Sequence, residues 1–385
     1  MKTIRKILSY VLVAALASAV SFAIASGNQP EIPGPTKLEQ LESLIQELFI
    51  GDVDTVAMED AAARAMVDSL GDQWSHYMSA KEFADYKEQM NNAYLGIGIT
   101  ILAQAGEEGF EVIRVEPNGP AREAGLQMGD ILIGAEDTDF TGMTSSEAGA
   151  IIKGEAGTTV RVKVLRGGQP MEFTVERRQI QVQVARGEMV TADTGLVTIV
   201  NFDSRCAEET LAAIETLLSQ GAEKIIFDVR NNPGGYKDEL VKILDYLLPE
   251  GPLFRSENYA GKVTVDESGS DCLDIPMAVL VNENSYSAAE FFAAALSEYE
   301  AAVVVGTRTS GKGYYQNTFE LKDGSAVGLS VGKYSTPNGV NLANVGITPD
   351  VVVEVDEETF AKIYNSLLPA AEDPQIAAAL EALEN

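Results

Sequence analysis

Histidine is almost absent from this sequence, which contains a single one, His76. A serine–histidine–aspartate triad would have to use that residue, and any metal site built from several histidines is excluded. Cysteine is nearly as rare, with only Cys206 and Cys272 and no C-x-x-C pair, so neither thiol redox chemistry nor a structural zinc site is expected. The sequence leaves open whether the two cysteines form a disulfide or stay as free thiols.

Basic residues are also scarce relative to acidic ones. The chain has 28 Lys and Arg residues against 58 Asp and Glu residues, which gives a formal net charge of −30. Because nucleic-acid binding depends on neutralising phosphates with basic groups, we expect no nucleic-acid partner. Such acidity is typical of a solvated surface, and nothing in the sequence calls for a cofactor.

The sequence has one long apolar run, at its N-terminus. Charged residues precede it, namely Lys2, Arg5 and Lys6. Ala23-Ile24-Ala25 at its end fits a small-x-small cleavage site, so residues 1–25 are predicted to be a signal peptide or a membrane anchor. The run barely reaches the length of a bilayer span, so both cleavage and anchoring through residues 4–25 remain open. Either way we expect export across the cytoplasmic membrane, to a secreted or membrane-anchored location on its outer side.

The hydrophobic pattern predicts an α/β multidomain protein. Residues 26–36 are a Pro- and Gly-rich linker, and apolar residues recur at helical spacing over residues 37–93, as in two or three helices. Over residues 94–178 the period changes to two, with short strands and two helices in a compact β-rich module. Residues 179–356 alternate strands with helices, as in a β/α core with parallel strands, and residues 357–385 form a C-terminal helical segment.

Individual elements follow from the same pattern. We expect strands at 96–101, 110–115, 130–133, 159–165, 171–176, 197–202, 224–229, 277–281, 302–305 and 314–321. We expect helices at 119–125, 145–153, 207–219, 237–248, 288–297 and from about 374 onward.

The first candidate site is the serine-rich turn that ends at Glu290. Ser287 follows a predicted strand and precedes a predicted helix, so its hydroxyl would be exposed at the strand's carboxyl end, beside the free N–H groups of the helix. The alternative is structural: Ser287-x-x-Glu290 is also a capping box, and the serine would then simply cap the helix. On this segment alone, capping is the favoured interpretation.

The second candidate site is the segment from Gly306 to Gly313, which nearly matches the phosphate-binding motif G-x-x-x-x-G-K-[ST]. Gly313 stands where that motif needs a hydroxyl residue for Mg²⁺, and a strand follows instead of a helix. Nucleotide binding is therefore disfavoured. Lys312 is then either a solvated turn lysine or a catalytic base.

The third candidate site is the segment Asp228–Gly235. Two glycines after a proline at a strand exit allow the backbone to approach a ligand and to present its N–H groups. Taken alone, this segment reads better as an ordinary turn between a strand and a helix.

Together and in this order, the three segments resemble one family, the carboxy-terminal processing or tail-specific proteases. In that family a D-L-R-x-N-P-G-G loop precedes an N-x-G-S-A-S-A-S-E segment and then a T-x-G-K-G-x-x-Q segment. The matching segments here are Asp228–Gly235, Asn282–Glu290 and Thr309–Gln316. Further segments resemble the family's D-P-Y-S-x-Y-L, its PDZ-domain motif S-P-A-x-x-A-G-L-x-x-G-D and its G-I-x-P-D: Gly71–Met78, Asn118–Asp130 and Gly346–Asp350.

This resemblance implies a serine endopeptidase with a crotonase/Clp-like spiral core and a PDZ domain. It implies that Ser287 is the nucleophile, Lys312 the base and Gln316 a residue that orients the base. The oxyanion would be held by the backbone N–H of Ala288 and that of Gly234 or Gly235. The PDZ domain would capture protein substrates with apolar C-terminal tails by strand addition. The loop expected to do this comprises Tyr94, Leu95, Gly96, Ile97 and Gly98.

The sequence departs from the family pattern beside the nucleophile. Asn284, Tyr286 and Ala289 stand where the family usually has Gly, Ala and Ser. None of these changes removes a proposed catalytic group. Tyr286 adjoins the pocket that would accept the substrate, so the resemblance does not carry a cleavage preference over to this chain.

The chemistry of a lysine base sets a physical requirement. An exposed lysine is neutral in only about one molecule in 2,500 at pH 7. We therefore expect Lys312 to be desolvated and to have no close carboxylate partner, with Tyr314 and Tyr315 contributing an apolar wall. In a straight strand the backbones of Lys312 and Gln316 would lie about 13 Å apart, so an orienting Gln316 needs a bend at Gly313; the alternative is a solvent-facing side chain.

Three other functions are compatible with parts of the sequence. They are a non-catalytic PDZ adaptor, a nucleotide-binding protein and a secreted scaffold that assembles through its helical ends. The presence of both Ser287 and Lys312 favours the protease. A homodimer formed through the terminal helices, including Leu38–Leu48, is compatible with each of them.

Overall fold

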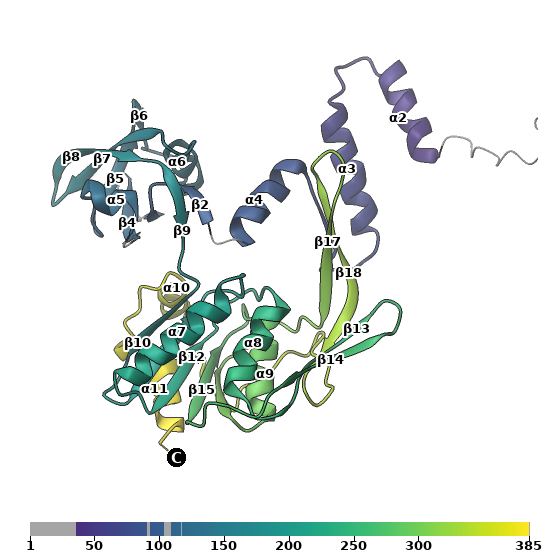
Figure 1. Cartoon of the computed structure of the whole chain (residues 1–385). Helices are drawn as coiled ribbons and strands as arrows, with labels where there is room; N and C mark the ends of the chain where they lie inside the picture. Colours follow the sequence, from purple (N-terminus) through teal and green to yellow (C-terminus); the bar gives the residue numbers. More distant parts are fainter. Residues whose placement is uncertain (1–35, 91–92, 104–108, 117, 385) are drawn as a thin grey trace, which may run out of the picture. The chain divides into compact units, whose positions relative to one another are not determined.

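The computed structural model describes residues 36–90, 93–103, 109–116 and 118–384 (Figure 1). The predicted signal peptide or anchor and nearly all of the predicted linker lie outside these residues. In the part of the chain that is described, no helix combines the length and the apolar character that a membrane span needs. The chain divides into two compact units, residues 1–65 and 66–385.

The described part of the first unit is helical, with α2 (Lys37–Leu48) followed by α3 (Thr55–Asp68), whose last residues belong to the second unit. Helix α2 begins at a capping box, because the Thr36 hydroxyl accepts from the N–H of Glu39 while the Glu39 carboxylate accepts from the N–H of Thr36. The leucines at the helical spacing seen in the sequence form an exposed stripe: Leu38, Leu41, Leu44 and Leu48.

The β-rich module within the second unit is built on an antiparallel sheet in the order β3-β4-β5-β7-β8. These strands are β3 (Ile99–Ala103), β4 (Phe110–Val115), β5 (Ile131–Ala135), β7 (Thr159–Arg166) and β8 (Gln169–Glu176), and β6 (Thr138–Asp139) pairs with β5. Helices α5 (Pro120–Ala124) and α6 (Ser145–Ile152) accompany the sheet. Its core consists of alternating inward side chains such as Val160, Val162 and Val164, as the period of two predicts.

The prediction of a single strand over residues 96–101 is wrong. Gly98 has a φ of +82°, a left-handed conformation that interrupts an extended strand. The segment is therefore split between β2 (Ala93–Gly96), which pairs with β9 (Arg178–Gln181), and β3, which pairs with β4.

The β/α core contains a six-stranded sheet in the order β10-β11-β12-β15-β16-β19. Its strands are β10 (Ala185–Met189), β11 (Thr194–Ile199), β12 (Lys224–Asp228), β15 (Met277–Val281), β16 (Ala302–Gly306) and β19 (Val351–Val352). All neighbours are parallel except β10 and β11.

Both faces of this sheet are covered, because successive residues of each strand point to opposite sides. Phe227 and Val279 face a cluster formed with α7 (Cys206–Ser219), α8 (Lys237–Leu247) and α9 (Ala288–Glu298). Ile226 and Ala278 face the other side, where α11 (Pro374–Ala382) packs (Figure 1). Both cysteines are free thiols: Cys206 is buried at the start of α7, and Cys272 is exposed.

A second, antiparallel sheet joins segments that are far apart in the sequence. Its order is β1-β18-β13-β14, and β17 also pairs with β18. The strands are β1 (His76–Met78), β13 (Gly251–Asn258), β14 (Val263–Ser268), β17 (Tyr314–Glu320) and β18 (Ala326–Ser335). Helix α4 (Ala80–Met90) follows β1, and the chain closes with α10 (Glu357–Tyr364), the short helix η1 (Ala370–Glu372) and α11.

The topology of the core determines where the candidate segments meet. Strands β12, β15 and β16 are parallel neighbours, so their carboxyl ends lie at one edge of the sheet. The three candidate segments follow directly from these ends. Because β15 lies between the other two strands, the turn that carries Ser287 lies between the Asp228–Gly235 loop and the Lys312 loop.

Candidate active site

Hydrogen bonds join the three loops at this edge of the sheet. The Ser285 hydroxyl donates to the carbonyl of Val229 (2.7 Å), and the N–H of Tyr286 donates to the carbonyl of Asn232 (3.1 Å). On the other side, the N–H of Ser310 donates to the carbonyl of Ser285 (3.2 Å). The serine turn is therefore fixed to both flanking loops through its backbone.

Ser287 is the N-cap residue of α9, so the structural alternative was a real one. However, its φ is +59° and its ψ is −127°, whereas an ordinary N-cap residue is extended. Ser287 and Glu290 form the predicted capping box, and the N–H of Glu290 also donates to the carbonyl of Ser287 (2.9 Å), so this N–H has an acceptor besides the hydroxyl. A non-glycine residue held in a strained conformation is a feature of functional sites rather than of simple caps.

Glu290 links the nucleophile candidate to the base candidate. Its Oε2 accepts from the N–H of Ser287 (3.0 Å) and from the N–H of Lys312 (2.9 Å). Its Oε1 accepts from the Thr309 hydroxyl (2.6 Å) and from the N–H of Gly311 (2.7 Å). Two nitrogens that share one acceptor cannot lie more than about 6 Å apart, so the backbones of Ser287 and Lys312 are neighbours.

The Glu290 side chain is fully buried. Burial raises the pKa of this carboxyl, while the Thr309 hydroxyl and the backbone N–H groups that it accepts from act in the opposite direction. From the sequence, Glu290 is predicted only as the partner in a capping box. That spacing was the one signal for it, and the spacing does not reveal that the same carboxylate also holds the Lys312 loop.

Lys312 lies against aromatic rings. Its Nζ is 4.8 Å from the ring centroid of Trp74 and 5.8 Å from that of Tyr286. Burial lowers the pKa of Lys312, and the charges of Glu290 and Asp72 oppose this shift. The predicted desolvation of Lys312 is thus confirmed. Among the described residues, no carboxylate forms an ion pair with its amine.

The predicted source of the apolar wall is wrong. Tyr315 instead stacks on Tyr334 with ring centroids 5.0 Å apart, and Tyr314 is exposed. Strand β17 pairs with β18 from Tyr314 onward, so these two neighbouring side chains point to opposite faces of their own sheet. Trp74, which lies 238 positions before Lys312 in the sequence, takes the place expected for them.

The proposed oxyanion residues lie beside Ser287. A Cβ on Gly234 would lie 2.7 Å from the Cβ of Ser287 and 2.9 Å from the nitrogen of Ala288, so only glycine fits there. The N–H of Gly234 donates to the side chain of Asn232 (2.8 Å). Ala288 is the first residue of α9, so its N–H has no acceptor inside the helix. The structure therefore favours Gly235 over Gly234 as the second donor.

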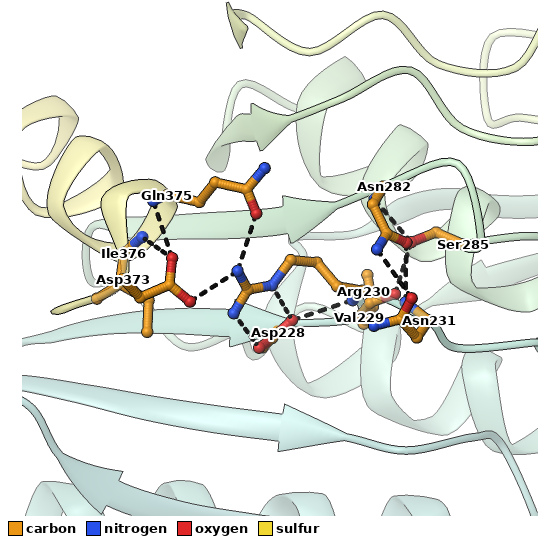
Figure 2. Close-up of polar contacts among 9 residues, drawn as sticks. All are labelled: Asp228, Val229, Arg230, Asn231, Asn282, Ser285, Asp373, Gln375 and Ile376. Atoms are coloured by element: carbon orange, nitrogen blue, oxygen red, sulfur yellow. Dashed lines mark hydrogen bonds and ion pairs between the residues drawn. The ribbon is translucent and has the colours of Figure 1, made fainter. Parts of the chain in front are cut away.

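A buried ionic cluster, shown in Figure 2, fixes the root of the Asp228–Gly235 loop. The Arg230 guanidinium donates to both oxygens of Asp228, through Nε (2.9 Å) and Nη2 (2.7 Å). Its Nη1 reaches Asp373 (2.8 Å) and the side-chain oxygen of Gln375 (2.8 Å), at the start of α11. The side chains of Arg230 and Asp373 are 4% and 3% exposed, so this is an interior network of charges. We call it the arginine clamp.

The hydrogen bonds of the Gln316 side chain in the described part of the chain go to residues other than Lys312. Its side-chain nitrogen donates to the carbonyl of Tyr314 (3.1 Å) and to the hydroxyl of Ser330 (3.0 Å). The strand pairing shifts register between Tyr315 and Gln316, so the irregularity lies two residues after the bend expected at Gly313. An orienting role for Gln316 stays a prediction.

A cavity of about 530 Å³ opens beside the candidate oxyanion donor. Helix α4, the start of α8 and strand β17 contribute to its walls. The lining residues are Tyr86, Lys87, Gly235, Tyr236, Gln316, Asn317, Thr318 and Phe319. Gly235 is therefore reached from this cavity, whose lining does not include Ser287 or Lys312.

The candidate peptide-binding loop of the β-rich module lies across β2 and the turn that follows it. Tyr94, Leu95 and Gly96 pair with β9, and Gly98 forms the turn into β3. Burial raises the pKa of Tyr94 to about 12. Ile97 is 1% exposed and packs in the core of the module. Strand β3 is at the end of its sheet, with β4 as its neighbour on one side.

Comparison with known proteins agrees with this arrangement. Residues 193–353 match peptidase family S41, and residues 93–176 match the PDZ domain family. The chain is 30% identical over 377 residues to the carboxy-terminal processing protease CtpA of Bacillus subtilis, covering 94% of this chain and 80% of that protein. It is 31% identical over 329 residues to the carboxyl-terminal-processing protease of a Synechocystis strain, covering 84% of this chain and 76% of that protein.

A solved structure supports the fold. The crystal structure of a putative S41 protease from Bacteroides fragilis superimposes with a TM-score of 0.59 at 18% identity, covering 93% of this chain and 99% of that one. At this level of identity the likeness concerns the fold alone.

Proposed function

Because this chain belongs to peptidase family S41, as a serine-type carboxy-terminal processing protease with a PDZ domain, we propose that Ser287 is its nucleophile and Lys312 its general base. The observation that carries this assignment is the shared oxygen of Glu290, which brings the backbones of the two residues together. The desolvation of Lys312 supplies the chemical condition that a lysine base needs.

In the proposed reaction, the neutral amine of Lys312 accepts the proton of the Ser287 hydroxyl as Oγ attacks the scissile carbonyl carbon. The carbonyl oxygen becomes an oxyanion, which accepts hydrogen bonds from the N–H groups of Ala288 and Gly235. The lysine ammonium then gives its proton to the leaving amine, and the C–N bond breaks to leave an acyl-serine. Water then gives a proton to the same amine and attacks the ester; the C–Oγ bond breaks, the acyl part leaves as a carboxylic acid, and the lysine ammonium returns the proton to Oγ of Ser287.

A non-catalytic PDZ adaptor does not account for the peptidase part of the chain. An adaptor needs only the PDZ domain, whereas this chain matches the peptidase family over residues 193–353 and resembles proteases along most of its length. The chain is accordingly a peptidase, and the PDZ domain is one part of that peptidase.

We propose that the PDZ domain captures the C-terminal tails of protein substrates. A tail would add as a strand along β3, the strand at the end of its sheet, with its carboxylate at the backbone of Tyr94–Gly98. We expect the bound tails to end in apolar residues, as the resemblance to the tail-specific proteases implies.

We also propose that the protease acts outside the cytoplasmic membrane. The charged and then apolar N-terminus of residues 1–25 supports export, with anchoring through residues 4–25 if it is not cleaved. The exposed leucine stripe of α2 is a candidate surface for a homodimer.

The test of this function is digestion of an unstructured protein by residues 26–385, with Ser287→Ala and Lys312→Ala in parallel. Substrates should carry matched tails that end either in apolar residues or in Asp. We expect cleavage by the parent alone, faster with apolar tails. Cleavage that persists in Ser287→Ala would show that the nucleophile lies elsewhere, and equal rates with both tails would refute the proposed tail recognition.

A further inference from the structure

The only tryptophan of the chain lies against the lysine of the active site. Trp74 and Tyr286 approach each other with ring centroids 6.1 Å apart, and the Lys312 amine lies over both rings, 4.8 and 5.8 Å from their centroids. Both amine-to-ring distances are within the roughly 6 Å at which a cation is attracted to an aromatic face. The three side chains come from the turn before β1, the turn before α9 and the loop after β16.

The turn that carries Trp74 is fixed by its own hydrogen bonds. The Asp72 carboxylate accepts from the N–H groups of Trp74 (3.3 Å) and Ser75 (3.1 Å). The Ser75 hydroxyl accepts from the N–H of Ser330 in β18 (3.0 Å), and the hydroxyl of Ser330 accepts from Gln316. The position of Trp74 is thus tied to the same strands that follow Lys312.

We propose that Trp74, together with Tyr286, is a positioning residue for the general base: the two rings hold the Lys312 amine in place without a carboxylate. This inference rests on the proposed role of Lys312 and adds to it the groups that make that role possible.

The physical reason is that a lysine base passes through two charge states. Before the reaction it must be neutral, so a facing carboxylate would weaken it by stabilising the ammonium. After it takes the serine proton it is an ammonium in a half-buried site, where an uncompensated charge is costly. Aromatic faces meet both demands, because they exclude water from the amine and still attract the cation that forms.

The charged groups around the Lys312 amine leave it without a carboxylate partner, as these two demands require. Glu290 and Asp72 both influence Lys312, but the oxygens of each accept hydrogen bonds from nearby N–H and hydroxyl groups. Neither forms an ion pair with the Lys312 amine in the described part of the chain. The phenol of Tyr286 is a further titratable group beside the amine, and burial raises its pKa, with Tyr364 adding to the shift.

The first experiment uses Trp74 as its own probe. Because the chain has one tryptophan, its selectively excited emission reports on this site alone. In the inactive Ser287→Ala protein we expect the emission to titrate with a midpoint below the ordinary lysine value and below the range where tyrosines ionise. In Ser287→Ala combined with Lys312→Met this transition should vanish. A transition that survives in the double variant, or none in the single one, overturns the proposed contact.

The second experiment measures kcat/KM against pH for Trp74→Ala and Trp74→Phe. Trp74→Ala lets water reach the amine, so the acid limb should move to higher pH; each unit of movement lowers kcat/KM on that limb tenfold. Trp74→Phe keeps an aromatic face and should stay within about threefold of the parent. Gln73→Ala, an exposed neighbour in the same turn, is the matched control and should be unchanged.

The outcomes separate this inference from the proposed function. If Lys312→Ala is inactive while Trp74→Ala keeps the acid limb of the parent, the base is correct and the positioning role of Trp74 is wrong. If Lys312→Ala retains activity, the proposed base itself fails, and the fluorescence titration still decides whether the amine lies on Trp74.

Discussion

The loop that carries Gly235 and the loop that carries Lys312 flank the same serine turn, yet different interactions hold them. The first is fixed at its root by the arginine clamp, in which a buried guanidinium is shared between Asp228, Asp373 and Gln375 (Figure 2). The second is held by backbone hydrogen bonds to Glu290 and by the faces of Trp74 and Tyr286. Ion pairs between fully charged groups therefore hold the Gly235 loop and not the Lys312 loop.

The roles that we propose for the two loops account for the difference. Oxyanion donors are backbone N–H groups whose protonation never changes, so strong ion pairs nearby do them no harm. The lysine must lose and regain a proton in each cycle, and a close carboxylate would bind it in the charged state. Burial accordingly lowers the pKa of Lys312, whereas the carboxylates around Arg230 raise the pKa of its guanidinium.

The largest effect on kcat/KM is expected when Lys312 is replaced by a residue that always carries its charge. Lys312→Arg keeps length and charge but supplies a group that does not deprotonate in proteins. We expect kcat/KM to fall by at least about 10³-fold at every pH, because the serine then has no base. Peptide hydrolysis across the pH range is the measurement. Substantial activity in this variant would show that Lys312 acts only as a cation, and the contrast between the two loops would fail.

The next effect concerns the arginine clamp. Arg230→Met leaves Asp228 and Asp373 buried without their partner, and we expect a loss of about 3–5 kcal/mol in the free energy of unfolding. Urea unfolding measures this loss. Lys362→Met, which breaks an exposed pair with Glu358 in α10, is the matched control and should leave the free energy of unfolding unchanged.

A milder variant tests the same clamp if Arg230→Met does not fold. Asp373→Asn removes one charge from Arg230 but retains a side chain that caps α11 well. It should lose stability and activity together. Stability equal to that of the parent would mean that the ionic contact to α11 is not needed for the loop.

A smaller change in the free energy of unfolding, of opposite sign, is expected for a substitution of Lys312. The pKa of Lys312 is lower in the folded protein than in the unfolded chain, so at neutral pH the unfolded chain binds this proton more readily. Lys312→Met removes that penalty and should stabilise the fold by about 1 kcal/mol near pH 7. Because the penalty disappears as the pH rises toward the unfolded lysine value, the gain should shrink near pH 10. Urea unfolding at the two pH values measures it, and a gain independent of pH would contradict this account.

The smallest effect is expected for Gln316→Ala. Its amide bonds to Ser330 and Tyr314 rather than to Lys312, so we expect the loss of about one neutral hydrogen bond, or roughly fivefold in kcat/KM. A loss close to that of Lys312→Ala, measured in the same assay, would instead show that Gln316 reaches the lysine during catalysis.

Much of the fold could be predicted because local patterns determine it. Strand β4 and strand β15 have the predicted bounds, and α9 extends the prediction by one residue. The hairpin of β13 and β14 gave no such signal, because its side chains are mostly only half-buried and its strands lack a clean alternation. The break at Gly98 depends on one backbone angle, which a period of two does not reveal.

The site shows a similar limit. The three loops could be assembled from sequence because each carries its own motif and follows a parallel strand. Trp74 could not be connected with Lys312, since 238 positions separate them and the contact depends on the pairing of β1 with β18. The clamp is likewise invisible in the sequence, because Arg230 and Asp373 meet only when α11 packs on the sheet.

The arginine clamp also bears on the order of events during synthesis. A chain translated as far as residue 370 already contains the serine, the lysine and both glycines, but it lacks Asp373 and Gln375. The partners that α11 supplies to Arg230 therefore come after both loops in the sequence, and we expect the Asp228–Gly235 loop to be fixed at its root only once α11 has packed on the sheet.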